Sequence, residues 1–199
     1  MLARVNGKVD RAMRRILLAR HGETAWNAAG RLQGHTDIAL NDIGRDQARA
    51  LAATLAATGL RGVWTSDLGR ARETGEIVAS TLGLPAPQVD PELRERRFGV
   101  FEGLTRDQCT TQHPDAWKAW QAQTQAPPGG EARELAVIRM ARALERIAAL
   151  EQGPVLVVSH GGLMRLWLMD LLGTTVPLIK NGATYLVDHD GSAFRVTPS

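Results

Sequence analysis

Short apolar runs alternate with longer segments of helical periodicity along most of the chain. Apolar runs bounded by turn residues predict strands over Arg15–Arg20, Gly62–Thr65, Val89–Leu93 and Pro154–Val158, and a hairpin over Tyr185–Asp188 and Phe194–Val196. Helices are expected over Asp42–Thr58, Leu68–Leu82, Pro114–Gln123, Glu131–Gln152 and Gly162–Leu172. Strands separated by helices predict an α/β fold: a doubly wound, mostly parallel sheet with helices on both faces and an antiparallel edge strand.

Two of the predicted helices carry recognisable end signals. Asn41 is a candidate N-cap for the helix that starts at Asp42, and Gly59 is expected to stop it. Its apolar positions follow helical spacing, as the apolar face of a helix does: Ile43, Ala48, Leu51, Ala52 and Leu55. The next helix can be capped by Ser66 or Asp67 and is expected to end at Gly83.

The alternation of strands and helices defines the expected domain organisation. We expect one domain over residues 15–199, preceded by a basic, mobile extension over residues 1–14. Residues 102–130 do not fit the alternation, and we expect them to form a small helical lid over the site. A length of 199 residues suits one domain with such a lid, and 44% apolar residues suffice for an ordinary core.

The basic charge of the chain is concentrated near its start. The sequence pI is about 9.6, but five of the 24 basic residues and one of the 21 acidic residues lie within residues 1–15. The remainder is therefore close to neutral. Residues 1–15 also contain no aromatic side chain to stack on bases, which argues against a nucleic-acid partner. A translation start placed too early and an oligomer contact remain alternatives for this segment.

Cysteine content and hydropathy indicate the cellular compartment of the protein. Cys109 is the single cysteine, which excludes an intrachain disulfide and zinc sites built from several thiolates. A reducing compartment follows, and we expect a cytoplasmic protein. No apolar run approaches the roughly 20 residues of a membrane span, and residues 1–15 lack the apolar core of a secretory signal.

Candidate chemistry lies at the ends of two predicted strands. Arg20 and His21 follow the apolar run at residues 16–18, and His160 follows the run at residues 154–158. Each histidine precedes a glycine, and open α/β folds bind ligands at the carboxyl ends of their strands. Two histidines could bind a metal, but a neighbouring guanidinium repels a cation and attracts an anion. The pattern therefore indicates a phosphate site.

Two further residues could serve such a site. Arg70 lies in the first turn of a predicted helix, where a cation is slightly unfavourable against the helix dipole unless it points at an anion. Glu95 lies among arginines and could act as a general acid near a leaving group. A solvated charge is the alternative for both side chains.

These residues belong to an ordered set that resembles the histidine phosphatase superfamily, also called the phosphoglycerate-mutase-like family. The stretch ARHGETAWN at Ala19–Asn27 resembles the family signature. The resemblance covers about residues 14–190 and continues through Arg31 to Gly34, Asp37, Leu40 to Gly44, Gln47, Ala48, Ser66, Asp67, Arg70, Ala71, Thr74, Leu93 to Gly103, Gly130, Glu131 and Ser159 to Gly162. It places the chain nearest the small bacterial phosphatases of the family.

The resemblance implies a role for each matching residue. His21 is implied as the nucleophile that forms a phosphohistidine, and Glu95 as the proton donor to the leaving alkoxide and then the base for water. The implied phosphate pocket consists of Arg20, Asn27, Gln33, Gly34, Arg70, His160 and Gly161. A protonated His160 and two arginines could neutralise the phosphoryl group without Mg²⁺, so we expect no metal and no cofactor. Ser159 and Thr74 also match family positions, but packing is the favoured interpretation for both.

The lid distinguishes the possible activities. The resemblance implies that cofactor-dependent phosphoglycerate mutases are longer chains that carry paired arginines in this region. Residues 102–130 of this chain contain only Arg106 and Lys118 as cations. We therefore expect metal-independent hydrolysis of a phosphomonoester on a small phosphorylated metabolite. The alternatives are a mutase, a phosphatase for α-ribazole phosphate or a sugar bisphosphate, and a non-catalytic phosphate-binding domain.

The remaining candidate side chains do not identify the substrate. Lys118, Arg106 and Arg97 could meet a substrate carboxylate or remain solvated, and Trp117 and Trp120 could pack or contact substrate. The resemblance also allows a homodimer through a sheet edge.

Overall fold

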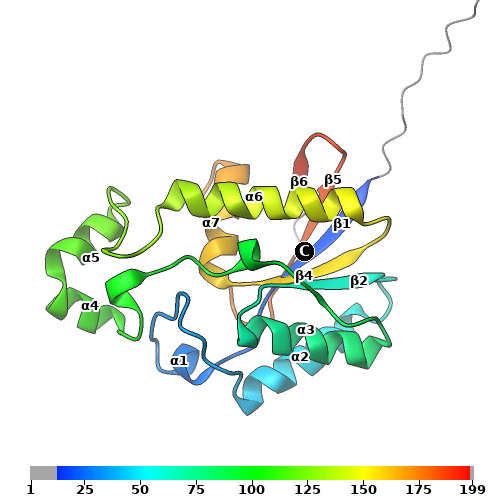
Figure 1. The fold of residues 1–199 in the computed structure, drawn as a ribbon, viewed down its shortest axis with the longest axis horizontal. Coiled ribbons are helices and arrows are strands. Elements are labelled where there is room, and N and C mark those ends of the chain that lie inside the picture. Colours follow the sequence, from blue (N-terminus) through cyan, green and yellow to red (C-terminus); the bar gives the residue numbers. More distant parts are fainter. Residues whose placement is uncertain (1–12, 198–199) are drawn as a thin grey trace, which may run out of the picture.

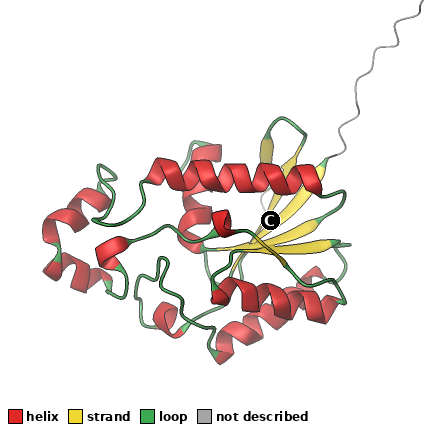
Figure 2. Cartoon of the chain, viewed as in Figure 1, coloured by secondary structure: helices red, strands yellow, loops and turns green. Residues whose placement is uncertain are grey.

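The computed structural model describes residues 13–197, and it places a six-stranded sheet at the centre of the molecule (Figure 1, Figure 2). The strand order is β3-β2-β4-β1-β5-β6. Pairs β1·β4, β2·β4 and β2·β3 are parallel, and β1·β5 and β5·β6 are antiparallel. The strands are β1 Arg14–Arg20, β2 Gly62–Thr65, β3 Gln88–Val89, β4 Val155–Ser159, β5 Thr184–His189 and β6 Phe194–Thr197.

Helices cover both faces of the sheet, as Figure 1 shows. The α-helices are α1 Ala25–Ala28, α2 Asp42–Leu55, α3 Gly69–Leu82, α4 Arg106–Gln112, α5 Pro114–Gln121, α6 Arg133–Leu150 and α7 Gly161–Leu172. Two 3₁₀ turns lie at Pro91–Leu93 and Gly99–Phe101. The α/β class, the mostly parallel sheet and the antiparallel edge predicted from the sequence are confirmed.

Alternation along the two central strands divides the core into two layers. Ile16 and Leu18 of β1 pack with α6 and α7, whereas Ala19 packs with α2 and α3 on the opposite face. In the same way, Val157 of β4 packs with α6 and α7, and Leu156 packs with α2 and α3. Because both faces are covered, the central strands are apolar throughout, which is why they read as continuous runs in the sequence.

The predicted third strand is largely wrong. The extended part ends at Val89, and a 3₁₀ turn occupies Pro91–Leu93. Pro91 fixes its own φ and has no N–H for a ladder, and the Asp90 carboxylate accepts the N–H of Glu92 at 2.9 Å. These two features turn the chain out of the sheet, so Glu95 lies in a loop.

The first long helix differs from the prediction at its end and on its apolar face. Asn41 caps it through the Gly44 N–H at 2.8 Å, as expected, but α2 ends at Leu55 because Thr58 closes a turn on the Leu55 carbonyl. Ile43 is 57% exposed. Gly44 faces inward in its place, against the backbone of Glu23.

The start of α3 is stabilised from a distant loop. The expected caps serve other partners: Ser66 accepts the N–H of Leu68, and Asp67 forms an ion pair with Arg94. The carboxylate of Asp37 accepts the N–H of Gly69 at 2.8 Å instead. The expected end is confirmed, since Gly83 takes the left-handed conformation (φ 67°) that a C-cap requires.

A helical lobe formed by residues 102–130 extends beyond the sheet on the side of α1 (Figure 1). It contains α4, which the sequence pattern missed, and α5. Phe98, Phe101, Cys109 and Trp117 form its apolar cluster. This cluster therefore packs Cys109 and Trp117 of the lobe against Phe98 and Phe101 of the segment just before it.

The start of the chain is only partly described. Strand β1 begins at Arg14, one residue before its predicted start. The expected mobile extension falls mainly on residues 1–12, which lie outside the described residues. Within residues 13–197, no helix has both the length and the apolar character that crossing a membrane requires.

Candidate active site

The candidate site forms where three parallel strands end side by side. Arg20 pairs in register with Ser159, and Thr65 of β2 pairs with Val158 on the other side of β4. His21 and His160 directly follow β1 and β4, and their ring centroids lie 5.1 Å apart. The sheet thus brings together two histidines that are 139 positions apart in the sequence.

His21 is held in one tautomer. Its Nδ1 lies 2.6 Å from the carbonyl oxygen of Gly22, so Nδ1 carries the proton and donates it. Nε2 lies 3.3 Å from the Nε of Arg70, which is a donor. With the proton on Nδ1, the Nε2 nitrogen carries the lone pair and accepts from Arg70. Burial, followed by the charges of Arg70 and Arg20, holds the pKa of His21 well below its ordinary value, so the ring is neutral at pH 7.

Arg70 is a fully buried cation whose position is fixed by backbone oxygens. Its terminal nitrogens donate to the carbonyls of Thr36 at 3.0 Å and Gly34 at 2.8 Å. The Asp37 carboxylate lies 3.8 Å away. Burial lowers the pKa of Arg70 from its ordinary value, but a guanidinium in a protein stays charged. The oxygens of Gly34, Thr36 and Asp37 therefore compensate for the unfavourable position of a cation at the start of α3.

Arg20 supplies a second cation from the end of β1. Its Nη1 donates to the carbonyl of Ile179 at 2.6 Å, and its Nε is buried without a partner among the described residues. A Cβ atom at Gly161 would lie 2.9 Å from this Nε. Gly161 therefore allows Arg20 to approach the start of α7, which explains the glycine after His160.

His160 lies next to His21 with its hydrogen-bonding capacity unused. Its side chain is fully buried, and neither ring nitrogen has a partner within residues 13–197. Burial and the charge of Arg70 hold the pKa of His160 well below its ordinary value. The expectation of a protonated His160 is therefore wrong for this structure, because the ring is buried among cations.

Glu95 binds the amino end of α7. Its carboxylate accepts the N–H groups of Gly162 at 2.9 Å and Leu163 at 2.7 Å, and that of Arg96 at 2.8 Å. A helix amino end favours a negative charge, so this placement stabilises a carboxylate. The expected general acid is thus buried and attached to the helix that begins next to His160.

The loop that carries Glu95 is fixed by α6. The guanidinium of Arg139 donates to the carbonyls of Glu92, Arg94 and Glu95 at 2.6–3.0 Å and forms a two-pronged ion pair with Glu131. His35 adds a contact from its Nε2 to the Glu95 carbonyl at 2.8 Å. These contacts replace the strand hydrogen bonds that the loop lacks.

The remaining predicted pocket residues line the same cavity. Asn27 uses its Oδ1 to accept from Thr24 and Asn181, which leaves its amide nitrogen as a donor. Gln33 is buried, and its Oε1 has no partner in the described part of the chain. Gly34 has φ 56°, and a Cβ there would collide with the Glu102 carboxylate. Gly34 therefore contributes its carbonyl to Arg70 and a close approach to Glu102.

The two family positions outside the pocket have hydrogen-bonding roles. Ser159 donates to the carbonyl of Leu93 at 2.8 Å and so connects β4 to the loop before Glu95. Thr74 accepts the N–H of Gly22 at 3.0 Å and donates to the carbonyl of Arg70 at 2.7 Å. Both are buried side chains that join elements carrying the site.

All the predicted site residues except His160 line one cavity of about 290 Å³, and the His160 ring lies next to that of His21. The sequence pattern missed several of its other lining residues: Arg31, Leu32, Arg96, Phe98, Arg165, Leu166, Leu178 and Ile179. Of the residues considered for substrate contact, Arg106 and Trp120 line the cavity, whereas Arg97, Trp117 and Lys118 do not. Arg165 lies four positions after Gly161, so helical spacing is the signal that places it on the same face of α7.

The donor set suits an anion. Arg20 and Arg70 border the two neutral histidines, and Glu95 is bound to backbone N–H groups. Within the described chain, no group of three or more His, Cys, Asp or Glu side chains gathers in a way that could hold a metal ion. The pocket thus presents two cations, the His21 imidazole and one carboxyl group to a small ligand, and the His160 ring lies beside that of His21.

The sequence matches the histidine phosphatase superfamily (branch 1) over residues 16–197. It is 39% identical to the metal-independent phosphoserine phosphatase of Arabidopsis thaliana over 163 residues, which cover 79% of this chain and 68% of that protein. It is 36% identical to the probable phosphoglycerate mutase GpmB of Serratia proteamaculans over 189 residues, covering 90% and 87%.

A solved structure gives the same assignment. The mycobacterial glucosyl-3-phosphoglycerate phosphatase in complex with VO3 superposes with a TM-score of 0.83 and 32% identity, covering 94% of this chain and 98% of that one. The chain belongs to the histidine phosphatase superfamily. The resemblance noted from the sequence is confirmed, and with it the expectation of an enzyme of the phosphomonoesterase type.

Proposed function

We propose that this chain hydrolyses small phosphomonoesters without a metal ion, through a phosphohistidine on Nε2 of His21. The observation that carries the proposal is the tautomer of His21. Its Nδ1 proton is committed to the Gly22 carbonyl, and its Nε2 lies beside Arg70 in a cavity that Arg20 and Arg70 also line, with the His160 ring next to it. Because phosphoryl transfer depends on positioning and charge neutralisation, such a pocket supplies what the reaction needs.

The first step transfers the phosphoryl group to the enzyme. Nε2 of His21 forms a bond to phosphorus while the bond from phosphorus to the alkoxide oxygen breaks. Protonated Glu95 gives its proton to that oxygen, and the alcohol leaves. The N–H groups of Gly162 and Leu163 stabilise the carboxylate that Glu95 becomes. The Arg20 and Arg70 guanidiniums bind the equatorial oxygens, and His160 can donate to one of them.

The second step releases phosphate. The Glu95 carboxylate takes a proton from water, the water oxygen bonds to phosphorus, and the bond from Nε2 to phosphorus breaks. Glu95 is protonated again and His21 is neutral again, so the cycle closes. One set of cations serves both steps because the phosphoryl group stays between them while the histidine and oxygen atoms exchange.

The location and the partners of the enzyme are further expectations. The relatives include a phosphoserine phosphatase and a glucosyl-3-phosphoglycerate phosphatase, which supports a small phosphorylated metabolite as substrate here. We expect the enzyme to act in the cytoplasm, on account of its single buried cysteine. A homodimer would have β6 or β3 available as a sheet edge, and light scattering at several concentrations tests it.

The experiment is a panel of phosphomonoesters assayed after treatment with a chelator. The panel holds 3-phosphoglycerate with and without 2,3-bisphosphoglycerate, phosphoserine, sugar phosphates and α-ribazole phosphate. We expect phosphate release that is abolished in His21→Ala and retained in His113→Ala, because His113 is a histidine of the lobe that does not line the cavity. Quenched reactions should show a protein mass increase of one acid-labile phosphoryl group.

Two results would contradict the proposal. Activity that survives in His21→Ala would exclude a phosphohistidine intermediate on His21. Interconversion of 2- and 3-phosphoglycerate with little phosphate release would make the enzyme a mutase, which is the alternative that the name of the GpmB relative favours.

A further inference from the structure

The segment between α7 and β5 contacts the catalytic site at several points. Within residues 179–183, the carbonyl of Ile179 accepts from the Arg20 guanidinium at 2.6 Å. The N–H of Gly182 donates to the Arg20 carbonyl at 3.1 Å, and the N–H of Arg20 donates to the Ala183 carbonyl at 3.0 Å. This short segment therefore fixes both the backbone and the side chain of Arg20.

Asn181 extends from this segment to two further residues of the site. Its Nδ2 donates to the backbone carbonyl of His21 at 3.0 Å and to Oδ1 of Asn27 at 3.2 Å. An amide nitrogen carries two protons, so each contact can use a proton of its own. Asn181 is not among the residues that line the catalytic cavity. Its side chain therefore acts on residues of the site rather than on a ligand.

The contact with His21 supplies a partner for the backbone just beyond the end of β1. The N–H of His21 donates to the Ser159 carbonyl at 3.0 Å, which continues the pairing with β4 by one residue. The His21 carbonyl accepts from the Asn181 side chain. Because His21 is buried, an unpaired carbonyl there would be costly. This contact anchors the Asn181 amide and directs its nitrogen toward Asn27.

The contact with Asn27 determines which end of that amide can reach the cavity. Oδ1 of Asn27 also accepts from the N–H and the hydroxyl of Thr24, each at 3.2 Å. With three donors around Oδ1, the oxygen end of the amide is bound to the protein. Asn27 itself lines the cavity, so its nitrogen end is the one that can donate to a ligand. A reversed amide would present an oxygen to an anion.

We propose that Asn181 is a positioning residue for phosphoryl transfer, and that it holds the Asn27 amide with its N–H groups toward the phosphoryl oxygens. This inference rests on the proposed function, because the ligand is the phosphoryl group that Arg20 and Arg70 bind. A donor that is already oriented stabilises the charge of the transition state without reorganising. Asn181 thus contributes to the rate although it does not touch the substrate.

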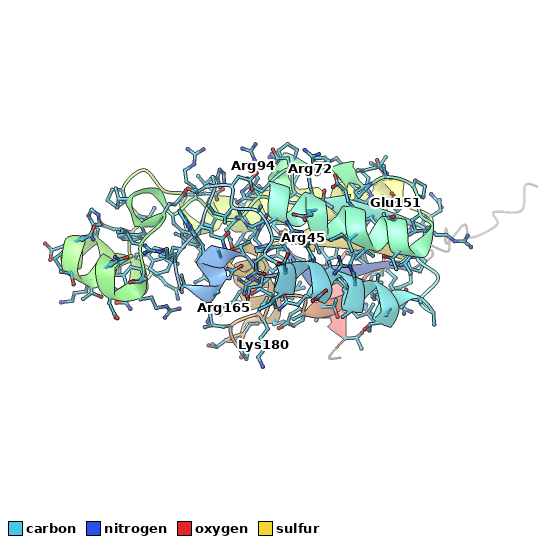
Figure 3. The ribbon with its side chains drawn as sticks, turned by 90° about the horizontal axis from the view of Figure 1, so that it is seen from below. Arg45, Arg72, Arg94, Glu151, Arg165 and Lys180 are labelled. Atoms are coloured by element: carbon cyan, nitrogen blue, oxygen red, sulfur yellow. The ribbon has the colours of Figure 1, made fainter. Side chains whose placement is uncertain are left out.

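Asn181→Ala tests the role because it removes both hydrogen bonds without adding a charge. We expect kcat/KM for the best phosphomonoester of the panel to fall about tenfold, and the inhibition constant of inorganic phosphate to rise by about the same factor. The control is Lys180→Ala, the preceding residue of the same segment. Figure 3 shows Lys180 at the lower edge of the view, and its side chain is exposed. Both quantities should stay at their wild-type values in this control.

A double-mutant cycle tests whether Asn181 acts through Asn27. Asn27→Ala removes the amide that Asn181 orients, so adding Asn181→Ala should then lower kcat/KM by less than about threefold. A merely structural role of Asn181 would give about the same tenfold loss in both backgrounds, because independent effects add. The coupling therefore measures the contact between the two amides.

Asn181→Asp is a second variant, which keeps the shape of the side chain where truncation loosens the fold. It replaces the donor by an oxygen that faces two other oxygens, the His21 carbonyl and Oδ1 of Asn27. Repulsion should turn the Asn27 amide away, and the added charge opposes phosphate binding. We therefore expect a larger loss of kcat/KM than in Asn181→Ala, together with weaker inhibition by inorganic phosphate.

The outcomes separate this inference from the proposed function. If Asn181→Ala and Asn181→Asp match the wild type in kcat/KM and in phosphate inhibition, the positioning role is overturned while the phosphatase stands. The same holds if the loss caused by Asn181→Ala is as large in the Asn27→Ala background. If the wild type releases no phosphate from any ester of the panel, the proposed function itself fails.

Discussion

Glu95 and Gly162 are in direct contact across the site. The Gly162 N–H donates to the Glu95 carboxylate at 2.9 Å, and a Cβ atom at position 162 would lie 2.7 Å from Oε1 of the same carboxylate. The glycine therefore provides both a donor and the space that the acid occupies. This contact connects the loop after the 3₁₀ turn to the helix that begins beside His160.

Gly162→Ala should displace Glu95 and leave the phosphate pocket in place. We expect kcat to fall roughly 10- to 100-fold, because a general acid–base group is moved, while inhibition by inorganic phosphate changes little. The control is Gly62→Ala in β2, where an added Cβ meets only ordinary contacts at 3.8 Å. Steady-state kinetics with phosphate inhibition give both numbers. An unchanged kcat in Gly162→Ala would separate the position of Glu95 from catalysis.

Arg139 should act as a positioning residue for Glu95. Arg139→Lys keeps the charge but cannot serve the three loop carbonyls and Glu131 together. We expect kcat to fall about tenfold with KM nearly constant, because the loop moves and the cations that bind phosphate do not. Arg142→Lys is the matched control, since Arg142 pairs with Glu92 on the exposed face of the same helix. Equal effects of the two variants would contradict this role.

Thr74 should stabilise the turn that carries His21. Thr74→Val preserves the shape but leaves the buried Gly22 N–H without its acceptor, which costs about 1–3 kcal/mol of unfolding free energy. Thr74→Ser restores the hydroxyl and should recover most of that loss. Urea unfolding measures both variants. If valine and serine were equally stable, the Gly22 N–H would have to find another partner.

The two buried histidines should make the fold sensitive to acid. Burial and the charge of Arg70 hold the pKa values of His21 and His160 well below their ordinary value, and burial lowers that of His35. In the unfolded chain each histidine titrates near pH 6.5, so the unfolded state takes up protons that the folded state does not. Stability is therefore fully present above about pH 6.5 and is lost as the pH falls.

The expected slope is roughly 1.4 kcal/mol per pH unit for each histidine. Unfolding free energies from urea titrations between about pH 5 and pH 7.5 measure it. His160→Gln should have a shallower slope by about one histidine. A free energy that is independent of pH in this range would show that neither histidine is kept neutral by the fold.

The strands β1, β2 and β4 could be read from the sequence because both of their faces are buried, which gives uninterrupted apolar runs. The site residues could be named because they belong to the ordered motifs of the family, and Arg20, His21 and His160 lie at the ends of β1 and β4. The strand predicted at Val89–Leu93 failed because Pro91 and Asp90 form a local turn. The helix α4 was missed because its seven residues are mostly polar and carry no helical apolar stripe.

The sequence alone determined the fold class, the family and most of the residues that line the candidate cavity, because these depend on local pattern and on short motifs. Only the tertiary structure decided that Nε2 of His21 carries the lone pair, that Glu95 accepts the N–H groups at the start of α7, and that Arg96, Arg106, Arg165 and Trp120 line one cavity. These relationships join residues from separate elements. No local pattern encodes their distances, which follow from how the sheet, α7 and the helical lobe pack together.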